Sequence, residues 1–482
     1  MRFWITIGLI TVLSAVGLTY EIAAGRVLAP FFGTSLLTWT AVIATILAGF
    51  SLGSALGGFV AERPRRAAVG LVRMSLVATA VLMALSPTLL GLLHGWGARG
   101  TEGMLLSVVV AFFPASVCVT IPSPYLARVA IEARPGREGS SLGLVLAAGS
   151  LGAIVGAILA GFVALPLIGS TATFAGCGIV AVLCVPLVAG GPPGGGSGPQ
   201  SGVVLAAAAF VVFAGVAGGP ACMYESGLSC LHVERRGGEV RLYSDRTIQA
   251  AEKLSPAGDS LALSYTAWLW DRLDRDLGPA PEVLFVGGGG YTLPTRLLAS
   301  RPAAQAVAVE IDPLVTDVVR RHMPRASEMI ARAGYEARGG TTAGEGRLGI
   351  VHADGRVYIE ETGRRFDAAV MDAFSSGSVP AHLVTRETYE RLRAIVDGPV
   401  YVNLIDRPDG PLARGVHAIL DGLYRHVRAL QGPLSARGRG NVLLAASDRP
   451  LAPLDSLPGG YAPVSLSPAR AFTDDRGWVG HR

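Results

Sequence analysis

Long apolar stretches follow one another along the first 219 residues of the chain. A helix needs about 20 consecutive apolar residues to cross the hydrocarbon core of a membrane. Stretches of about this length lie near residues 3–20, 36–60, 69–93, 103–127, 141–168, 171–190 and 203–218. They recur far beyond the N-terminus, so a cleaved signal peptide does not explain them. The pattern predicts a multi-pass helical membrane bundle over residues 1–219, with about seven spans and a Gly/Pro-rich linker at 190–202.

Two of the spans carry small residues at four-residue spacing. On a helix this spacing places them on one face, where a neighbouring helix can approach closely. We therefore expect these faces to serve helix packing rather than transport. The residues are Gly49, Gly53 and Gly57 in one span, and Gly152, Gly156 and Ala160 in another.

The pattern changes in the second half of the chain. Residues 220–265 alternate between apolar and polar positions around a Gly-Gly pair at 237–238, which predicts a small domain of β-strands. Residues 266–482 alternate between strand-like and helix-like segments, which predicts a doubly wound, Rossmann-like α/β domain.

A glycine run follows the first strand of this α/β domain. Residues 283–312 read VLFVGGGGYTLPTRLLASRPAAQAVAVEID, a strand, a glycine turn, a helix and a second strand that ends in acidic residues. Glycines let the backbone approach a ligand, and a carboxylate about twenty residues later can bind both ribose hydroxyls. An adenosyl group is therefore the first ligand to consider. The candidate contacts are Gly287, Gly288, Gly289, Glu310 and Asp312.

Two further strand-like segments also end in aspartate. RLGIVHADGR ends at Asp354, followed by Gly355, and RFDAAVMDAF ends at Asp372. Acidic residues at successive strand ends would meet at the carboxyl edge of a parallel sheet, where ligands bind in open α/β folds. Taken singly, each could instead be a helix-capping or loop residue; taken together, they indicate a ligand site.

Charge sets the expected topology. The chain is 50% hydrophobic and 16% charged with mean hydropathy +0.46, and most of its charge lies in the second half. Its net charge of +5 includes two basic loops, residues 62–66 and the cluster Arg128, Arg134 and Arg137, which follow the second and fourth spans. Basic loops stay in the cytoplasm, so both loops and the N-terminus are expected there. No basic run interleaved with aromatic residues indicates nucleic-acid binding.

The basic loops alone do not fix the side of the membrane on which the second half lies. If residues 203–218 crossed the membrane fully, the second half would emerge outside, whereas adenosyl cosubstrates are made in the cytosol. We therefore expect a re-entrant 203–218 segment or a miscounted span, a cytoplasmic second half, and reduced Cys222 and Cys230. In an oxidising compartment these two cysteines could instead form a disulfide.

An ordered set of motifs carries a family resemblance. LYSDRTIQ ends at Gln249, and VGGGG, AVEID, HADGR, MDAF and LVTRETYERL follow it. Over about residues 220–450 this set resembles the spermidine synthase (polyamine aminopropyltransferase) family. YEIAAGRVLAPFF in the first half and FTDDRGWV near the end resemble the membrane-fused members of that family. The resemblance implies the methyltransferase/spermidine synthase version of the Rossmann-like fold.

The resemblance also implies roles for residues. Decarboxylated S-adenosylmethionine would be the cosubstrate, with its ribose on Glu310, its adenine near Asp354 and Gly355, and its sulfonium chain toward Gln249. Asp372 would accept the proton of the attacking amine. Tyr265 and Ser375 would contact the substrate. No Cys/His cluster indicates a metal.

Departures from the family pattern concern the acceptor. The family's glycine loop carries an aspartate, where this chain has Gly290-Tyr291-Thr292, and its Tyr-His-Glu is replaced by residues 265–267, Tyr-Thr-Ala. The catalytic loop keeps Asp372 but loses its second aspartate. A diamine needs carboxylates to bind its ammonium groups, so putrescine is not the expected acceptor.

Three functions remain open in order of preference. The first is a membrane-bound aminopropyltransferase-like enzyme acting on an amine. The second is another membrane-embedded enzyme on this scaffold, either a methyltransferase using S-adenosylmethionine or an enzyme of a lipophilic substrate. The third is a transporter or binding protein with a non-catalytic domain. The expected partners are the lipid bilayer of the cell (inner) membrane and a small amine or lipophilic acceptor, not nucleic acid, with a homodimer as a further expectation.

Overall fold

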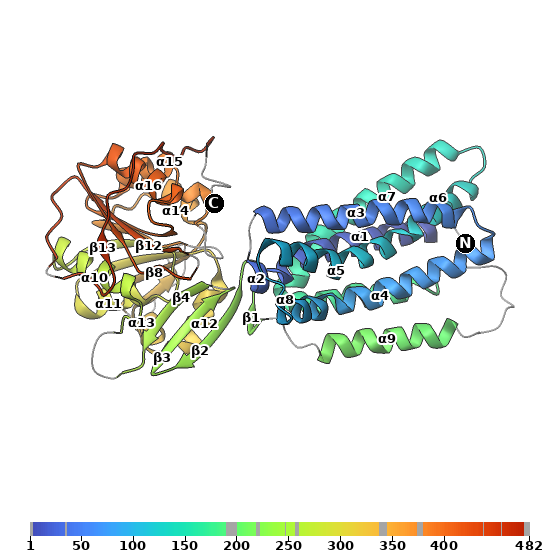
Figure 1. Cartoon of the computed structure of the whole chain (residues 1–482), viewed down its shortest axis with the longest axis horizontal. Coiled ribbons are helices and arrows are strands. Elements are labelled where there is room, and N and C mark those ends of the chain that lie inside the picture. The colour runs from blue at the N-terminus through green and yellow to red at the C-terminus, as the bar shows by residue number, and fades with distance from the viewer. Residues whose placement is uncertain are drawn as a thin grey trace. The chain divides into compact units, whose positions relative to one another are not determined.

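The computed structural model divides the chain into two compact units, Met1–Cys230 and Leu231–Arg482. It describes residues 3–33, 36–188, 200–217, 222–245, 247–255, 260–336, 345–373, 379–436, 438–454 and 456–476. The first unit is helical and the second is built on β-sheet (Figure 1). The sequence pattern predicts a boundary after residue 219, and residues 225–228 of the following segment bond to the helices of the first unit.

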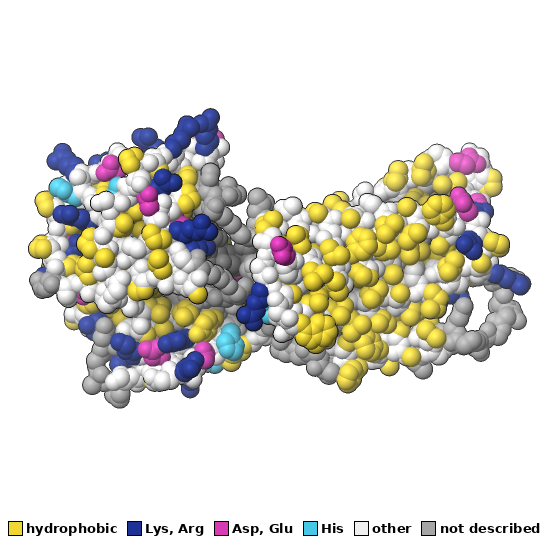
Figure 2. Space-filling view, viewed as in Figure 1, with side chains coloured by type: hydrophobic (Ala, Val, Ile, Leu, Met, Phe, Trp, Pro, Cys, Tyr) yellow, Lys and Arg dark blue, Asp and Glu magenta, His cyan; other side chains and the backbone are white. Residues whose placement is uncertain are grey.

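Helices account for almost all of the first unit. Five helical runs are long and apolar enough to cross a membrane: Phe3–Phe32, Leu37–Ala61, Arg65–Gly95, Gly100–Glu132 and Glu138–Cys184. Hydrophobic side chains cover the face of this unit seen in Figure 2. The individual helices are α1 (Phe3–Val27), α2 (Ala29–Phe32), α3 (Leu36–Ala61), α4 (Arg65–Gly95), α5 (Gly100–Thr120), α6 (Pro122–Glu132), α7 (Glu138–Ile158), the π-helical η1 (Leu159–Ala164), α8 (Leu165–Cys184) and α9 (Gln200–Ala217).

The last of the five runs contains two of the predicted spans. Its 47 residues are interrupted at Gly169, whose φ of 76° and ψ of 175° are not helical. The chain turns back there, because Gly156 of α7 packs on Ala15 of α1, and beyond the turn Cys177 of α8 donates to the carbonyl of Val16 at 3.9 Å. The predicted spans 141–168 and 171–190 are therefore the two arms of this run.

The bundle has two ends that can be told apart by their contacts. At the end that we call the basic end, Arg128 donates to the carbonyl of Ala61, and Arg73 donates to that of Val188 at 2.9 Å. At the other, the junction end, Ser170 beside the Gly169 turn donates to Glu225. The basic loops lie at the basic end, and residues 222–230 lie at the junction end.

Helix α9 runs between these two ends. Ala207, near its start, belongs to the same buried cluster as Val188 at the basic end, while Val211 packs farther along against Gly178 of α8. Its 18 residues make a helix about 27 Å long, close to the roughly 30 Å of a bilayer's hydrocarbon core. The chain then reappears at the junction end. The helix is not among the five runs long and apolar enough to cross a membrane, and the expectation of a re-entrant segment or a miscounted span stays a prediction.

The small-residue faces pack helices together, as predicted. A side chain at Gly53 of α3 would overlap the carbonyl of Val117 in α5, and one at Gly152 of α7 would overlap that of Thr11 in α1. At the latter contact, Thr19 donates to the carbonyl of Gly156 at 3.1 Å. Glycine thus permits backbone-to-backbone approach at both contacts.

A small antiparallel sheet leads into the second unit. Gly237 and Gly238, with φ of 58° and 78°, form the tight turn between its second and third strands, as the Gly-Gly pair predicted. In the described residues the sheet has the order β1-β2-β3-β4. Its strands are β1 (Tyr224–Glu225), β2 (Cys230–Arg236), β3 (Glu239–Ser244) and β4 (Thr247–Lys253).

The main sheet of the second unit is parallel at its centre. Its order over the described residues is β13-β11-β12-β10-β9-β5-β6-β8-β7. Strands β5 to β10 pair parallel with one another, and β11, β12 and β13 join the sheet through antiparallel pairs. The strands are β5 (Glu282–Val286), β6 (Gln305–Glu310), β7 (Gly334–Glu336), β8 (Leu348–His352), β9 (Ala368–Met371), β10 (Val400–Asp406), β11 (His426–Gln431), β12 (Gly440–Ser447) and β13 (Ala462–Pro463).

Helices cover both faces of this sheet, which makes it doubly wound. One face carries α14, α15 and α16 over a core that includes Leu284, Val307 and Leu404. The other carries α10 to α13. The helices are α10 (Ser264–Asp276), α11 (Thr292–Ser300), α12 (Pro313–His322), α13 (Pro324–Ala333), α14 (Gly355–Glu361), α15 (Arg386–Ile395) and α16 (Pro411–Leu423), with the 3₁₀ turn η2 (Ala381–Leu383). The strand order reverses between β5 and β9, and this is where open α/β sheets bind ligands.

Candidate active site

The glycine loop leaves β5 and touches the end of β9. Gly287 has a φ of 101° and donates its N–H to the carbonyl of Val309 at 2.9 Å. A side chain at this position would overlap the carbonyl oxygen of Asp372. Glycine is therefore required both by the backbone angle and by the close approach. The loop and Asp372 consequently lie against each other at the point where the strand order reverses.

Glu310 lies beneath this loop at the end of β6. Its side chain is 8% exposed, and it accepts the N–H of Gly289 at 3.1 Å and that of Asp312 at 3.0 Å. Burial raises the pKa of Glu310 to about 7, although the backbone N–H donors of Gly289, Ile311 and Asp312 act in the opposite direction. A carboxylate has about four lone-pair positions, so capacity remains for a ribose hydroxyl. The geometry therefore fits the ribose-binding role predicted from the sequence.

Asp312 and Asp354 each cap a helix. The Asp312 carboxylate accepts the N–H of Leu314 at 3.0 Å at the start of α12. The Asp354 carboxylate accepts the N–H of Arg356 at 2.8 Å at the start of α14, and its other oxygen lies 2.9 Å from Nε2 of His382. The capping alternative thus describes what both side chains do in the structure, and their binding of a nucleoside stays a prediction.

The remaining predicted donor contacts lie around the loop. Gly355 has no room for a side chain, because a Cβ there would come within 2.5 Å of Cγ1 of Val286. A Cβ at Gly289 would lie 3.6 Å from the carbonyl oxygen of Gln249, so the backbone of β4 lies beside the loop. Gly288 packs on Glu310 in the same way. The expected neighbours of a donor are therefore brought together, except that Ser375 lies outside the described residues.

Asp372 is the centre of a polar network just after β9. Its Oδ2 accepts the hydroxyl of Tyr265 at 3.1 Å, and its Oδ1 accepts the side-chain amide of Asn403 at 2.8 Å. Because a carboxylate only accepts, Asn403 must present its NH₂ group, which leaves its oxygen to accept from Asn441 at 2.9 Å. Burial raises the pKa of Asp372 to about 7, and both hydrogen bonds limit that rise.

Asn403 and Asn441 were missed in the sequence. Each is a single amide within a mostly apolar strand, YVNLID in β10 and GNVLLAAS in β12. The two strands pair antiparallel and place these residues close to each other across the sheet. Such a polar residue in a buried strand needs a partner, and that need was the available signal.

The structure shows what replaces the family's aspartate in the glycine loop. Tyr291 adopts the left-handed conformation with φ of 54°, and its side chain is fully buried. Its hydroxyl lies 2.7 Å from Oγ1 of Thr316, which in turn lies 3.0 Å from Nε2 of His352. A side chain at Gly290 would collide with Ala250. Residues 290–292 therefore offer a ligand no carboxylate.

Sequence comparison finds aminopropyltransferases. Over 152 residues the chain is 28% identical to the polyamine aminopropyltransferase of Korarchaeum cryptofilum, which covers 31% of this chain and 41% of that protein. Over 114 residues it is 32% identical to the polyamine aminopropyltransferase of Vibrio vulnificus, covering 23% and 32%. The matched part of the chain is spermidine synthase-like. It spans less than half the length of either relative.

Solved structures and family models add the following. No family model matches the chain. A probable spermidine synthase from Corynebacterium glutamicum aligns with a TM-score of 0.42 and 18% identity, over 51% of this chain and 93% of that one. Human methyltransferase-like protein 13 in complex with SAH aligns with a TM-score of 0.31 and 21% identity, over 40% and 86%.

Proposed function

We propose that the spermidine synthase-like half is a transferase that moves an aminopropyl group from decarboxylated S-adenosylmethionine to an amine. One observation carries this proposal: the backbone carbonyl of Asp372 lies against the Gly287 turn, the Asp372 carboxylate is held by Tyr265 and Asn403, and Gly289 of the same turn donates to Glu310. The proposed nucleoside site and the proposed proton acceptor thus share one sheet edge. The aminopropyltransferases found by sequence comparison support the choice of reaction.

The proposed chemistry is a direct displacement. The amine nitrogen forms a bond to the carbon beside the sulfonium, and the carbon–sulfur bond breaks with its electron pair passing to sulfur. The product nucleoside is then a neutral thioether, and the proton released by the amine passes to Asp372. A base works best when its pKa lies near the working pH, and burial brings the pKa of Asp372 to about 7.

The surrounding residues would hold the donor and the base in line. Glu310 would accept the ribose hydroxyls, with Gly287 to Gly289 allowing the backbone to approach, and Gln249 would flank the aminopropyl chain. Tyr265 and Asn403 donate to the two oxygens of Asp372, so they fix its orientation and favour its ionised form. Holding the reacting atoms in line can supply much of the rate.

The residues expected to bind the acceptor also allow a second candidate function. Where the family has an aspartate in the glycine loop, Tyr291 is buried with its hydroxyl beside Thr316, so this anchor for an ammonium group is missing. This favours an acceptor other than a diamine, such as a monoamine or a lipophilic amine. It equally fits methyl transfer from S-adenosylmethionine, which needs no diamine site. A purely binding role is disfavoured by the intact Asp372 network.

The two candidates leave different products. The full-length protein, in detergent or lipid nanodiscs, would be incubated with each donor and with panels of amines and lipid extracts. Mass spectrometry would then detect methylthioadenosine from aminopropyl transfer or S-adenosylhomocysteine from methyl transfer. We expect methylthioadenosine, formed only with the decarboxylated donor and lost in Asp372→Asn. Calorimetric binding of both donors without either product would instead establish a binding protein.

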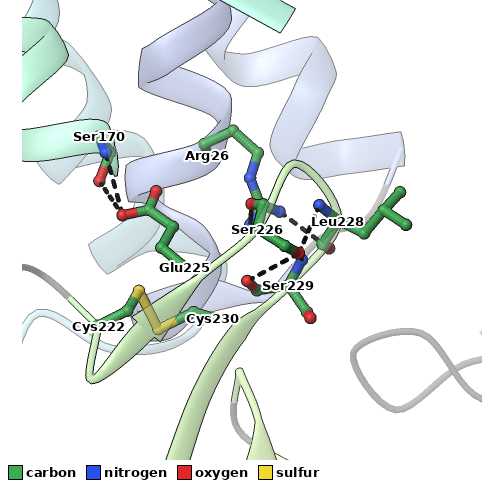
Figure 3. The surroundings of a disulfide bond; sticks show 8 residues. All are labelled: Arg26, Ser170, Cys222, Glu225, Ser226, Leu228, Ser229 and Cys230. Atoms are coloured by element: carbon green, nitrogen blue, oxygen red, sulfur yellow. Dashed lines mark hydrogen bonds between the residues drawn. A yellow bond between two sulfur atoms is a disulfide. The ribbon is translucent and has the colours of Figure 1, made fainter. Parts of the chain in front are cut away.

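The proposed function leaves open the side of the membrane on which this half lies. A cytoplasmic side was expected from the cytosolic origin of adenosyl donors. The expectation of reduced Cys222 and Cys230 is wrong, because the structure joins them in a disulfide (Figure 3). The sequence left both states open because two cysteines eight residues apart fit either.

A further inference from the structure

The disulfide closes a short loop at the junction end of the bundle. Cys222 and Cys230 have Cα atoms 5.4 Å apart, and both are buried. Figure 3 shows the loop between them lying on the helices, with Arg26 and Ser170 pointing into it. Structural disulfides persist in oxidising compartments and are rare in the reducing cytosol. The bond therefore indicates the side on which this loop is exposed.

Side chains from two helices hold the loop in place. Arg26, at the end of α1, donates to the carbonyls of Leu228 at 3.0 Å and Ser226 at 3.1 Å. Glu225 accepts from the backbone N–H of Ser170 at 3.0 Å and from its hydroxyl at 3.2 Å. Arg26 is thus occupied by carbonyls from the loop. The loop belongs to the end of the bundle formed by the end of α1 and the Gly169 turn.

The basic residues gather at the opposite end. Arg134 places its guanidinium 3.8 Å above the ring of Phe3, at the start of α1, and Arg128 bonds to Ala61 at the end of α3. The described loops at this end also hold Arg63, Arg65, Arg66 and Arg137, whereas those at the junction end hold Arg26 and Arg99. An excess of Lys and Arg marks the cytoplasmic side. The basic end is therefore cytoplasmic and the junction end is not.

The number of helices in the bundle also places the second half on the non-cytoplasmic side. The chain starts at the basic end, and the last helix of the bundle, α9, ends at the junction end; with the two arms that meet at Gly169 counted as two crossings and α9 as one, the number of crossings is odd. Beyond Cys230, the described residues contain no helix long and apolar enough to return through a membrane. Charge, helix count and the oxidised cysteines are three independent observations.

We infer that the loop 222–230 and the whole spermidine synthase-like half that follows it lie on the extracytoplasmic side, where the Cys222–Cys230 disulfide clamps the junction to the bundle. This inference goes beyond the proposed function and does not depend on it. Its consequence for any adenosyl chemistry is that donor and acceptor must both reach the outer side. A reaction or carrier that delivers a sulfonium nucleoside across the membrane must then precede this one.

Two matched single-cysteine variants test the side. Both start from a chain in which the free cysteines Cys118, Cys177 and Cys184 are alanine and the disulfide is kept. Ser140→Cys reports on the exposed start of α7 at the basic end, and Ser435→Cys on an exposed loop of the second unit. With a membrane-impermeant maleimide, we expect Ser435→Cys to react in intact cells and Ser140→Cys to react only after permeabilisation. The reverse pattern, or equal behaviour of both variants, overturns the inference.

The unmodified chain provides a second measurement should these variants fail to accumulate. Intact cells would be treated with an alkylating reagent and the protein digested without reductant. A linked peptide holding Cys222 and Cys230 supports the inference, and two separately alkylated cysteines overturn it. Protease added to intact cells should also remove the second unit, whereas its full protection would place that unit in the cytoplasm.

Discussion

The two halves of the molecule bury different kinds of polar group. In the helical unit, the buried polar side chains of the described residues are hydroxyls, apart from Arg26 at the junction end. They are typically bonded to nearby carbonyls, as Ser86 is to Ala111 at 2.9 Å. The second unit buries the carboxylate of Glu310 and half-buries that of Asp372, and the pKa values of both are raised to about 7. Raised pKa values mark groups prepared for proton transfer or ligand binding, so the chemistry is expected in the second unit and the packing role in the first.

The largest effect is expected at Asp372. Asp372→Asn keeps the shape and can still accept from Asn403 and bond to Tyr265, but it cannot take up a proton. Losing a general base typically costs about 10²- to 10⁴-fold in rate. Turnover by the full-length protein should fall by that amount while calorimetric donor affinity stays nearly unchanged. The control is Asp397→Asn, which changes an exposed carboxylate paired with Arg365 and should leave turnover and donor affinity unchanged. If Asp372→Asn turned over as fast as this control, Asp372 would not be the general base.

Glu310 should come next. Glu310→Gln replaces one acceptor oxygen by an NH₂ group that cannot receive a ribose hydroxyl. Hydrogen bonds to charged groups are worth roughly 1.5–3 kcal/mol, so the dissociation constant for an adenosyl donor should rise about 10- to 100-fold. Asp312→Asn is the matched comparison, because asparagine still caps α12. Equal affinities for Glu310→Gln and the unaltered protein would contradict ribose binding, and a loss in Asp312→Asn would add Asp312 to the site.

A third prediction concerns the helical unit. Gly53→Leu places a side chain where the carbonyl of Val117 lies, whereas the same change at Gly58, on the same helix, meets open space. Overpacking typically costs about 1–3 kcal/mol. Gly53→Leu should therefore lower the thermal midpoint and the yield of folded protein in detergent, and Gly58→Leu should not. If both behave alike, the glycine stripe of α3 is not a packing face.

The smallest effect is a shift in pH dependence. Asp372 acts as a base only when ionised, so kcat/KM should rise about tenfold per unit below pH 7 and level off above it. The Asn403 hydrogen bond lowers the pKa of Asp372, so Asn403→Ala should raise that pKa and move the profile to higher pH. A lower rate at pH 7 that recovers at pH 8.5 would show positioning through Asp372. An unshifted profile in Asn403→Ala would limit Asn403 to packing.

The sequence predicted those features that repeat or that lie at element ends. Apolar length located the helices, and strand-end acidic residues met at one sheet edge because parallel strands share their carboxyl ends. The residues that the sequence analysis missed are brought together by strands that pair across the sheet. Asn403 and Asn441 are single amides with no spacing pattern, and their contact arises from the pairing of β10 with β12. The cap at Asp312 was readable, since Asp before Pro313 is typical of a helix start.

The contact between Gly287 and the carbonyl of Asp372 constrains how this site can change over time. Any larger residue at Gly287 would push the base away, so the donor loop and the base must be inherited together. Tyr265, by contrast, comes from α10, a separate element, and donates its hydroxyl to the Asp372 carboxylate. A substitution at Tyr265 can remove this hydrogen bond without moving the Asp372 backbone. The orientation of the base can therefore change in a lineage while the donor loop is retained.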